Sequence, residues 1–90
     1  HGGALFTLAD FAFATASNSR GQLALSINAS ISIFKGAQKG RLIADAREVS
    51  TSPKLASFEV SVRNEAGDLL ATFQGMVYQK SVSLESLLPL

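Results

Sequence analysis

The first residue with chemical potential is Asp10, the only ionisable side chain between His1 and Arg20. It lies in the middle of the most apolar segment, from Gly3 to about Ser17, which is rich in alanine and leucine. A carboxylate buried there without a partner costs several kcal/mol, so a protein that keeps one usually pairs it or uses it. Two alternatives remain open: Asp10 caps a second helical segment that starts at Phe11, or it faces solvent from the helix edge.

The second feature is a glycine pair, Gly2 and Gly3, which follows His1 at the predicted start of the same helix. Backbone N–H groups at such an end are uncovered and point along the positive end of the helix dipole, where an anion or a developing oxyanion can bind. The alternative is a flexible start at which glycine only permits the turn.

The spacing of Gly2 and Asp10 predicts where an active site could form. Eight positions correspond to roughly 12 Å along a helix, so one chain cannot bring both groups to one carbonyl carbon. If two helices pack antiparallel across a two-fold axis, the glycine end of one lies beside Asp10 of the other. We therefore predict two equivalent sites per dimer, each shared between subunits.

The patterning of the chain predicts the elements that position these residues. The apolar segment predicts a largely buried helix that ends within 18–21. From Leu23 to Ile33 the odd positions are apolar and most even positions are polar, which predicts a strand with one dry face. Three further strands are expected at 41–50, 56–63 and 69–80, with Gly67 left-handed in the last turn. One helix followed by four strands is an α+β order, with the helix across one face of an antiparallel sheet.

Composition narrows the class of protein. The 90 residues are 47% hydrophobic and lack cysteine, which fits one small globular domain whose stability favours self-association. A net charge of +1 with interspersed signs argues against nucleic acid as a partner. No stretch approaches the ~20 apolar residues of a membrane span and no leader is recognisable, so a cytoplasmic location is expected. One histidine and no cysteine offer no metal-ligand cluster.

Several motifs together resemble one family. His1-Gly2-Gly3, followed by Leu8-Ala9-Asp10 and Phe13-Ala14, is similar to the start of the central helix in hotdog-fold acyl-CoA thioesterases of the phenylacetic-acid-degradation (PaaI-like) type. The resemblance covers roughly residues 1–80, the expected domain, and leaves 81–90 as a tail that is either a short docking helix or a frayed end. It continues through Ser30-Ile31-Ser32, Ala44-Asp45-Ala46-Arg47-Glu48-Val49, Glu59-Val60-Ser61-Val62-Arg63-Asn64 and Phe73-Gln74-Gly75-Met76-Val77-Tyr78.

The resemblance implies a hotdog fold, an antiparallel sheet wrapped around a long central helix. Relatives carry a helix and a first strand ahead of the His-Gly-Gly turn, and these are missing from this sequence. Relatives also often have a proline where this chain has Lys35-Gly36. A homotetramer is expected from the family, whereas the spacing argument requires only a dimer.

The implied reaction is hydrolysis of an aryl- or medium-chain acyl-CoA to the free acid and CoA. The amide of Gly2, in the turn with His1, would polarise the thioester carbonyl, and Asp10 of the facing subunit would act as general base or attack directly. Coenzyme A is part of the substrate, so no separate cofactor is implied. The alternatives are a non-catalytic acyl-CoA-binding or dimerisation module, and a hotdog hydratase, which needs a histidine that only His1 could supply.

The resemblance also suggests residues that bind the substrate. It places the CoA nucleotide near Ser50–Leu55, where Lys54 could meet a phosphate and Ser52 and Leu55 are further candidates, together with Gly3 at the helix start. An ordinary exposed turn is the alternative. Ser26 and Asn28 match strand positions that approach the substrate in relatives, although strict alternation would put their side chains on the polar face, away from the helix. Of the two, only Ser26 is kept as a candidate.

Overall fold

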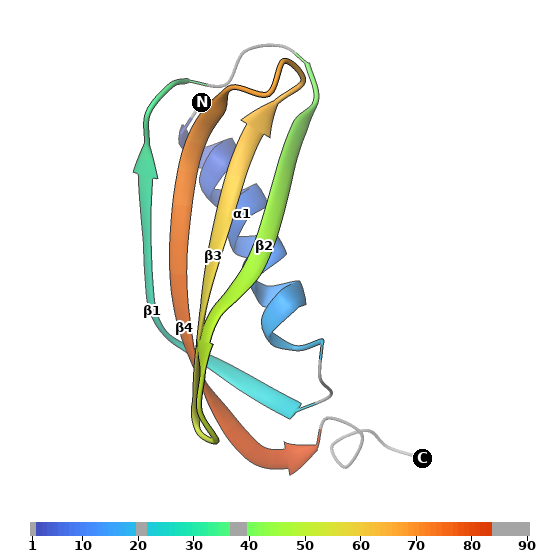
Figure 1. The fold of residues 1–90 in the computed structure, drawn as a ribbon, viewed down its shortest axis with the longest axis vertical. Coiled ribbons are helices and arrows are strands. Elements are labelled where there is room, and N and C mark those ends of the chain that lie inside the picture. The colour runs from blue at the N-terminus through green and yellow to red at the C-terminus, as the bar shows by residue number, and fades with distance from the viewer. Residues whose placement is uncertain (1, 20–21, 37–39, 84–90) are drawn as a thin grey trace.

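The computed structural model describes residues 2–19, 22–36 and 40–83. One helix, α1 (Gly2–Ser17), crosses one face of a four-stranded antiparallel sheet of β1 (Gln22–Ile33), β2 (Leu42–Thr51), β3 (Leu55–Asn64) and β4 (Leu69–Ser83). Figure 1 shows the helix behind the sheet, running beside the long axis of the molecule. The predicted α+β order of one helix and then four strands is confirmed, and the further helix and strand of relatives are not among the described residues.

The helix forms because its residues are mostly alanine, leucine and phenylalanine, with few β-branched side chains to crowd the preceding turn. Leu5, Ala9 and Phe13 recur every four residues and are buried against the sheet. The prediction of a largely buried helix is wrong for the single chain, because one sheet covers only one side of a helix. Phe11, on the opposite side, is 70% exposed.

The helix ends where the sequence predicted, and side chains add hydrogen bonds to its last carbonyl groups. The Ser17 hydroxyl and the Asn18 amide donate to the Ala14 carbonyl, and the Ser19 hydroxyl donates to the Ala16 carbonyl. The same two carbonyls also accept from the backbone N–H groups of Asn18 and Ser19, so each has both a backbone donor and a side-chain donor. Asn18 also accepts from the N–H of Ala24, which ties the helix end to β1.

The strand order in the sheet is β1-β4-β3-β2, so the chain crosses from one edge of the sheet to the other between its first two strands. The remaining connections are tight hairpins. The turn between β3 and β4 has Gly67 in the predicted left-handed conformation, with φ of 91°. The last strand continues to Ser83, three residues past its predicted end, and 84–90 lie outside the described residues.

The predicted alternation of β1 is interrupted by a bulge. Ser26 pairs with Val77 and Asn28 pairs with the adjacent Met76, so Ile27 is an extra residue with no pairing partner on β4. The bulge reverses which side chains face the helix on its two sides. The prediction of one continuous dry face is therefore wrong, and Leu25 and Ile27 are exposed in the single chain.

The centre of the helix–sheet contact is the ring of Phe13. It packs against the rings of Phe58 and Phe73, with centroids 5.9 and 5.4 Å away, and it lies directly over Gly75 of β4. A β-carbon at position 75 would lie 2.5 Å from two ring carbons of Phe13. Glycine is thus required here for close approach, not for an unusual backbone angle.

Candidate functional site

Asp10 projects from one flank of the helix, defined here by Phe6, Asp10 and Phe13. Residues three and four apart in a helix share a face, and the two phenylalanines of this flank both contact Phe73 on β4. Asp10 itself is exposed in the single chain. This position matches the alternative in which Asp10 faces solvent from the edge of the helix. No break in α1 precedes Phe11, which removes the capping alternative.

Beyond β4, the helix-facing side of β1 is largely uncovered. The helix packs mainly over β3 and β2 and touches β1 least. Cross-strand partners share a face, and four β1 residues pair with β4 residues buried beneath the helix. We call these helix-facing β1 positions the β1 strip: Ser26, Ala29, Ile31 and Ile33. Phe6 of the flank contacts Phe73, which pairs with Ile31, so the flank with Asp10 is on the β1 side of the helix.

Ser26 is placed differently from the prediction. Strict alternation put its side chain on the polar face, away from the helix. Because of the bulge at Ile27, Ser26 is in register with Val77, whose side chain is buried in the core on the helix side. Ser26 and Asp10 therefore lie along the same uncovered side of one chain, whereas Asn28, beyond the bulge, faces outward.

Gly2 and Gly3 form the first residues of α1, as predicted, and Gly3 is exposed. The first N–H groups of a helix have no partner within it, so they are available to a ligand. Gly2 lies in the same helix as Asp10, roughly 12 Å along the axis, and the need for a second copy stays a prediction. His1 lies outside the described residues.

The predicted CoA-binding loop is a tight hairpin connection between β2 and β3. The N–H of Ser52 donates to the Leu55 carbonyl at 2.7 Å, and the Ser52 hydroxyl accepts from the N–H of Leu55 at 3.1 Å. Ser52 and Leu55 thus hold the turn, and the side chain of Lys54 extends into solvent. The Lys54 carbonyl accepts from the N–H of Gln79, which fixes the loop to the end of β4.

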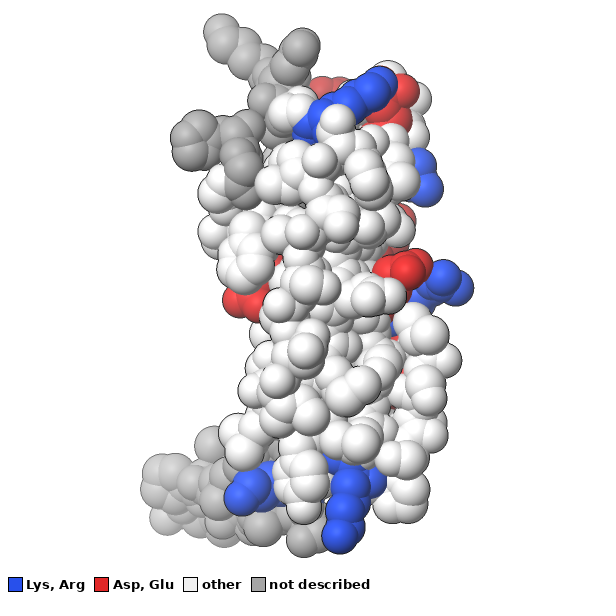
Figure 2. Space-filling model, turned by 90° about the vertical axis from the view of Figure 1, so that its left-hand side faces the viewer, with Lys and Arg blue, Asp and Glu red and all other residues white. Residues whose placement is uncertain are grey.

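Two residues beside this loop were missed by the sequence analysis. Lys80 follows Gln79 and adds a second exposed cation at the same end of the molecule, where Figure 2 shows basic side chains. Tyr78 lies in register with both Leu25 and Leu55, so three exposed apolar side chains form a row across the outer face. Only the pairing of β4 with both neighbours brings these residues together, so local sequence patterns could not reveal them.

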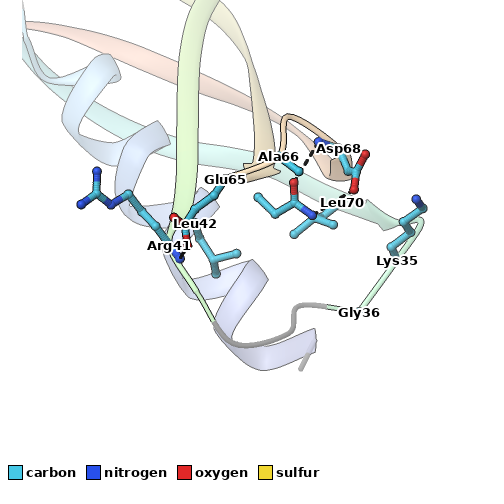
Figure 3. A pocket seen from close by; sticks show the side chains of 9 residues that line it. Lys35, Gly36, Arg41, Leu42, Glu65, Ala66, Asp68 and Leu70 are labelled. Atoms are coloured by element: carbon cyan, nitrogen blue, oxygen red, sulfur yellow. Dashed lines mark hydrogen bonds between the residues drawn. The ribbon is translucent and has the colours of Figure 1, made fainter.

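A cavity of about 570 Å³ lies elsewhere, between the β1–β2 connection and the β3–β4 turn. Its lining has two cations and two acids, and the acids are engaged: Glu65 accepts from the N–H of Arg41, and Asp68 accepts from the amide of Asn64. Figure 3 shows Lys35 and Arg41 on opposite sides of it. None of the predicted site residues lines this cavity.

The described part of the chain has neither a cluster of metal-ligating side chains nor a membrane-spanning helix. No group of three histidine, cysteine, aspartate or glutamate side chains there could hold a metal ion. No helix in the same residues is long and apolar enough to cross a membrane.

Comparisons with known proteins agree on one family. Residues 1–71 match the Thioesterase superfamily. A curated Archaeoglobus fulgidus protein, provisionally named an esterase, is 49% identical over 80 residues, which are 88% of this chain and 52% of that protein. The chain thus spans about half the length of this relative.

Solved structures show the same likeness. A point mutant of phenylacetic acid degradation protein PaaI from Thermus thermophilus has a TM-score of 0.81 and 41% identity, covering 89% of this chain and 69% of that one. A Streptococcus mutans protein solved bound to acetyl CoA has a TM-score of 0.81 and 28% identity, with coverage of 89% and 65%. The arrangement of helix and sheet is the hotdog fold.

Proposed function

Because this chain belongs to the thioesterase superfamily, we propose that it hydrolyses an aryl- or medium-chain acyl-CoA to the free acid and CoA. The proposal extends to this chain what similar proteins suggest: one is named for phenylacetic acid degradation and another was solved with acetyl CoA. The observation that carries it is Asp10, the one charged residue of α1, on the flank that faces the β1 strip.

In the proposed reaction Asp10 acts on water or on the thioester. As a general base, its carboxylate takes a proton from water while the water oxygen bonds to the carbonyl carbon; the C–S bond then breaks and the CoA sulfur takes up the proton. As a nucleophile, the carboxylate bonds to the carbonyl carbon and expels CoA, and water then hydrolyses the anhydride. Ser26, on the same side of the chain, is suited to orient the water by hydrogen bonding.

The proposed site also needs the amide end of a second helix. The partner subunit's Gly2 would donate its N–H to the carbonyl oxygen, and the helix dipole would stabilise the charge that develops there. His1, which precedes Gly2 in the sequence, remains a proposed participant. This arrangement requires a dimer at least, and a tetramer remains our expectation.

Self-association has support from the exposed surface of the single chain. Phe11, Leu25, Ile27 and Ile33 are all exposed apolar side chains. Figure 2, which views the narrow β1 side of the molecule, shows mostly uncharged side chains over its middle and charged ones near its ends and margins. The edge strand β1 contains no charged residue and no proline, the features that usually keep sheet edges apart.

For CoA, we propose that Lys54 and Lys80 attract the phosphates while Leu55 and Tyr78 offer an apolar surface to the nucleotide. Both lysines are exposed, and the Lys54–Gln79 backbone bond holds their segments together. Ser52 supports the loop through its bonds to Leu55, so its role is structural in this proposal. Gly3 would lie beside the acyl thioester at the helix start. No separate cofactor is proposed.

The test is turnover of a panel of acyl-CoA esters with detection of the free thiol, using the longest natural form of the protein that contains this chain. We expect Asp10→Asn to lower kcat by about 10²-fold or more, with an unchanged melting temperature. Asp45→Asn is the matched control, because Asp45 is an exposed carboxylate on β2, and it should keep full activity. Binding of acyl-CoA without turnover by the unaltered protein would favour a non-catalytic acyl-CoA-binding module instead.

A further inference from the structure

An exposed aromatic ring lies one helical turn from the proposed catalytic carboxylate. Phe6 precedes Asp10 by four residues on the same flank, which separates their backbones by about 6 Å. Its ring packs edge-on against Phe73, with centroids 5.8 Å apart, yet 42% of the residue is exposed. Phe6 is therefore held in place by the core and still presents apolar surface beside Asp10.

The β1 strip opposite this flank is apolar at one end and polar at the other. Ile31 pairs with Phe73, the residue that Phe6 contacts, and Ile33 lies two positions further along. Ser26 is at the other end, in register with Val77. A thioester bound at Asp10 would thus find an apolar surface toward Phe6 and a hydroxyl toward Ser26.

The charges around this surface select against one class of substrate. Neither α1 nor β1 contains a charged residue other than Asp10. An acyl group with its own carboxylate would be repelled by Asp10 and would find no cation on either element. An apolar acyl group loses contact with water against Phe6 and Ile31, which is favourable.

From this arrangement we infer that the ring of Phe6 contacts the acyl group of the bound thioester and determines a preference for neutral, apolar acyl chains. The inference rests on the proposed thioesterase activity. Ile31 and Ile33 complete the contact surface from β1. An aromatic acyl group gains the most binding free energy from this contact, because two aromatic rings attract each other beyond the effect of the area that they bury.

The experiment compares kcat/KM of Phe6→Ala with that of the unaltered protein on phenylacetyl-CoA, hexanoyl-CoA and acetyl-CoA. We expect the phenylacetyl-to-acetyl ratio to fall about tenfold or more, because the two-carbon acyl group barely reaches the ring. Phe6→Leu keeps an apolar side chain, so it should keep the turnover of hexanoyl-CoA. It should still lower the ratio of kcat/KM on phenylacetyl-CoA to kcat/KM on acetyl-CoA. The matched control is Ile43→Ala, which removes an equally exposed apolar side chain, at 43%, from the distant edge strand β2.

Each outcome decides the inference. Equal losses on all three esters, or an unmoved ratio, would overturn the role of Phe6 while leaving the thioesterase proposal intact. Absence of turnover of every ester by the unaltered protein would instead remove the proposed function. Light scattering on Phe6→Ala measures the size of its assembly. A smaller assembly together with an unchanged phenylacetyl-to-acetyl ratio would mean that Phe6 is covered by a second copy of the chain and does not contact the acyl group.

Discussion

Gly75→Ala tests the packing that holds the helix and its carboxylate against the sheet. The added methyl carbon would lie 2.5 Å from two carbons of the Phe13 ring and 2.8 Å from a third, where ordinary contacts are about 3.5–4.0 Å. The ring cannot move away freely, because Phe13 is buried between Phe58 and Phe73. Overpacking of this kind costs about 1–3 kcal/mol.

For a domain of this size, a 2 kcal/mol loss lowers Tm by roughly 8–16 °C. Thermal and urea melts at one fixed protein concentration are the assay, since self-association would otherwise shift the midpoints. Relieving the clash gives a second check. Phe13→Leu should lower the free energy of unfolding less in the Gly75→Ala protein than in the unaltered protein. The difference between the two losses, the coupling free energy, should be about 1 kcal/mol or more.

Two other glycines serve as controls. Gly36 has open space around its α-carbon and no left-handed backbone angle, so Gly36→Ala should change stability by less than about 0.5 kcal/mol. Gly67 also has open space but a φ of +91°, so Gly67→Ala should cost about 1 kcal/mol or more through backbone strain alone. A Gly75→Ala protein as stable as Gly36→Ala would refute the packing described for Phe13.

Two further predictions concern the proposed site. Ser26→Ala should lower kcat by about tenfold with little change in KM, whereas Ser30→Ala, on the outward face of the same strand, should leave both unchanged in steady-state assays. Lys54→Gln should raise KM for acyl-CoA several-fold without changing kcat, and the difference should shrink as salt rises because the contact with phosphate is screened; equal KM values at low salt would contradict a phosphate role.

Much of the fold was predictable because its signals are local. The spacing of Leu5, Ala9 and Phe13 predicts which side of the helix is buried, and the alternation from Ala56 to Val62 predicts the buried face of β3. Gly67 marks its turn because few other residues adopt a positive φ. These properties depend on neighbours within a few positions.

The remaining features depend on contacts between distant segments. The bulge at Ile27 arises from how β1 pairs with β4, and it moves Ser26 to the helix side against the local alternation. β1 and Phe11 are exposed because no other part of the single chain covers them. No local pattern in the sequence predicts this. The positions of Tyr78 and Lys80 beside the β2–β3 loop likewise follow from strand order alone.

The most direct test of a site shared between two chains is complementation between two inactive variants. Asp10→Asn removes the carboxylate, and Gly2→Pro removes the first helical N–H at a position where proline is compatible with a helix. After equal mixing and reassembly, half of the dimers contain both variants and have one intact site of two. We predict recovery to about one quarter of the unaltered activity. A mixture no more active than the mean of the two separate variants would contradict the shared site.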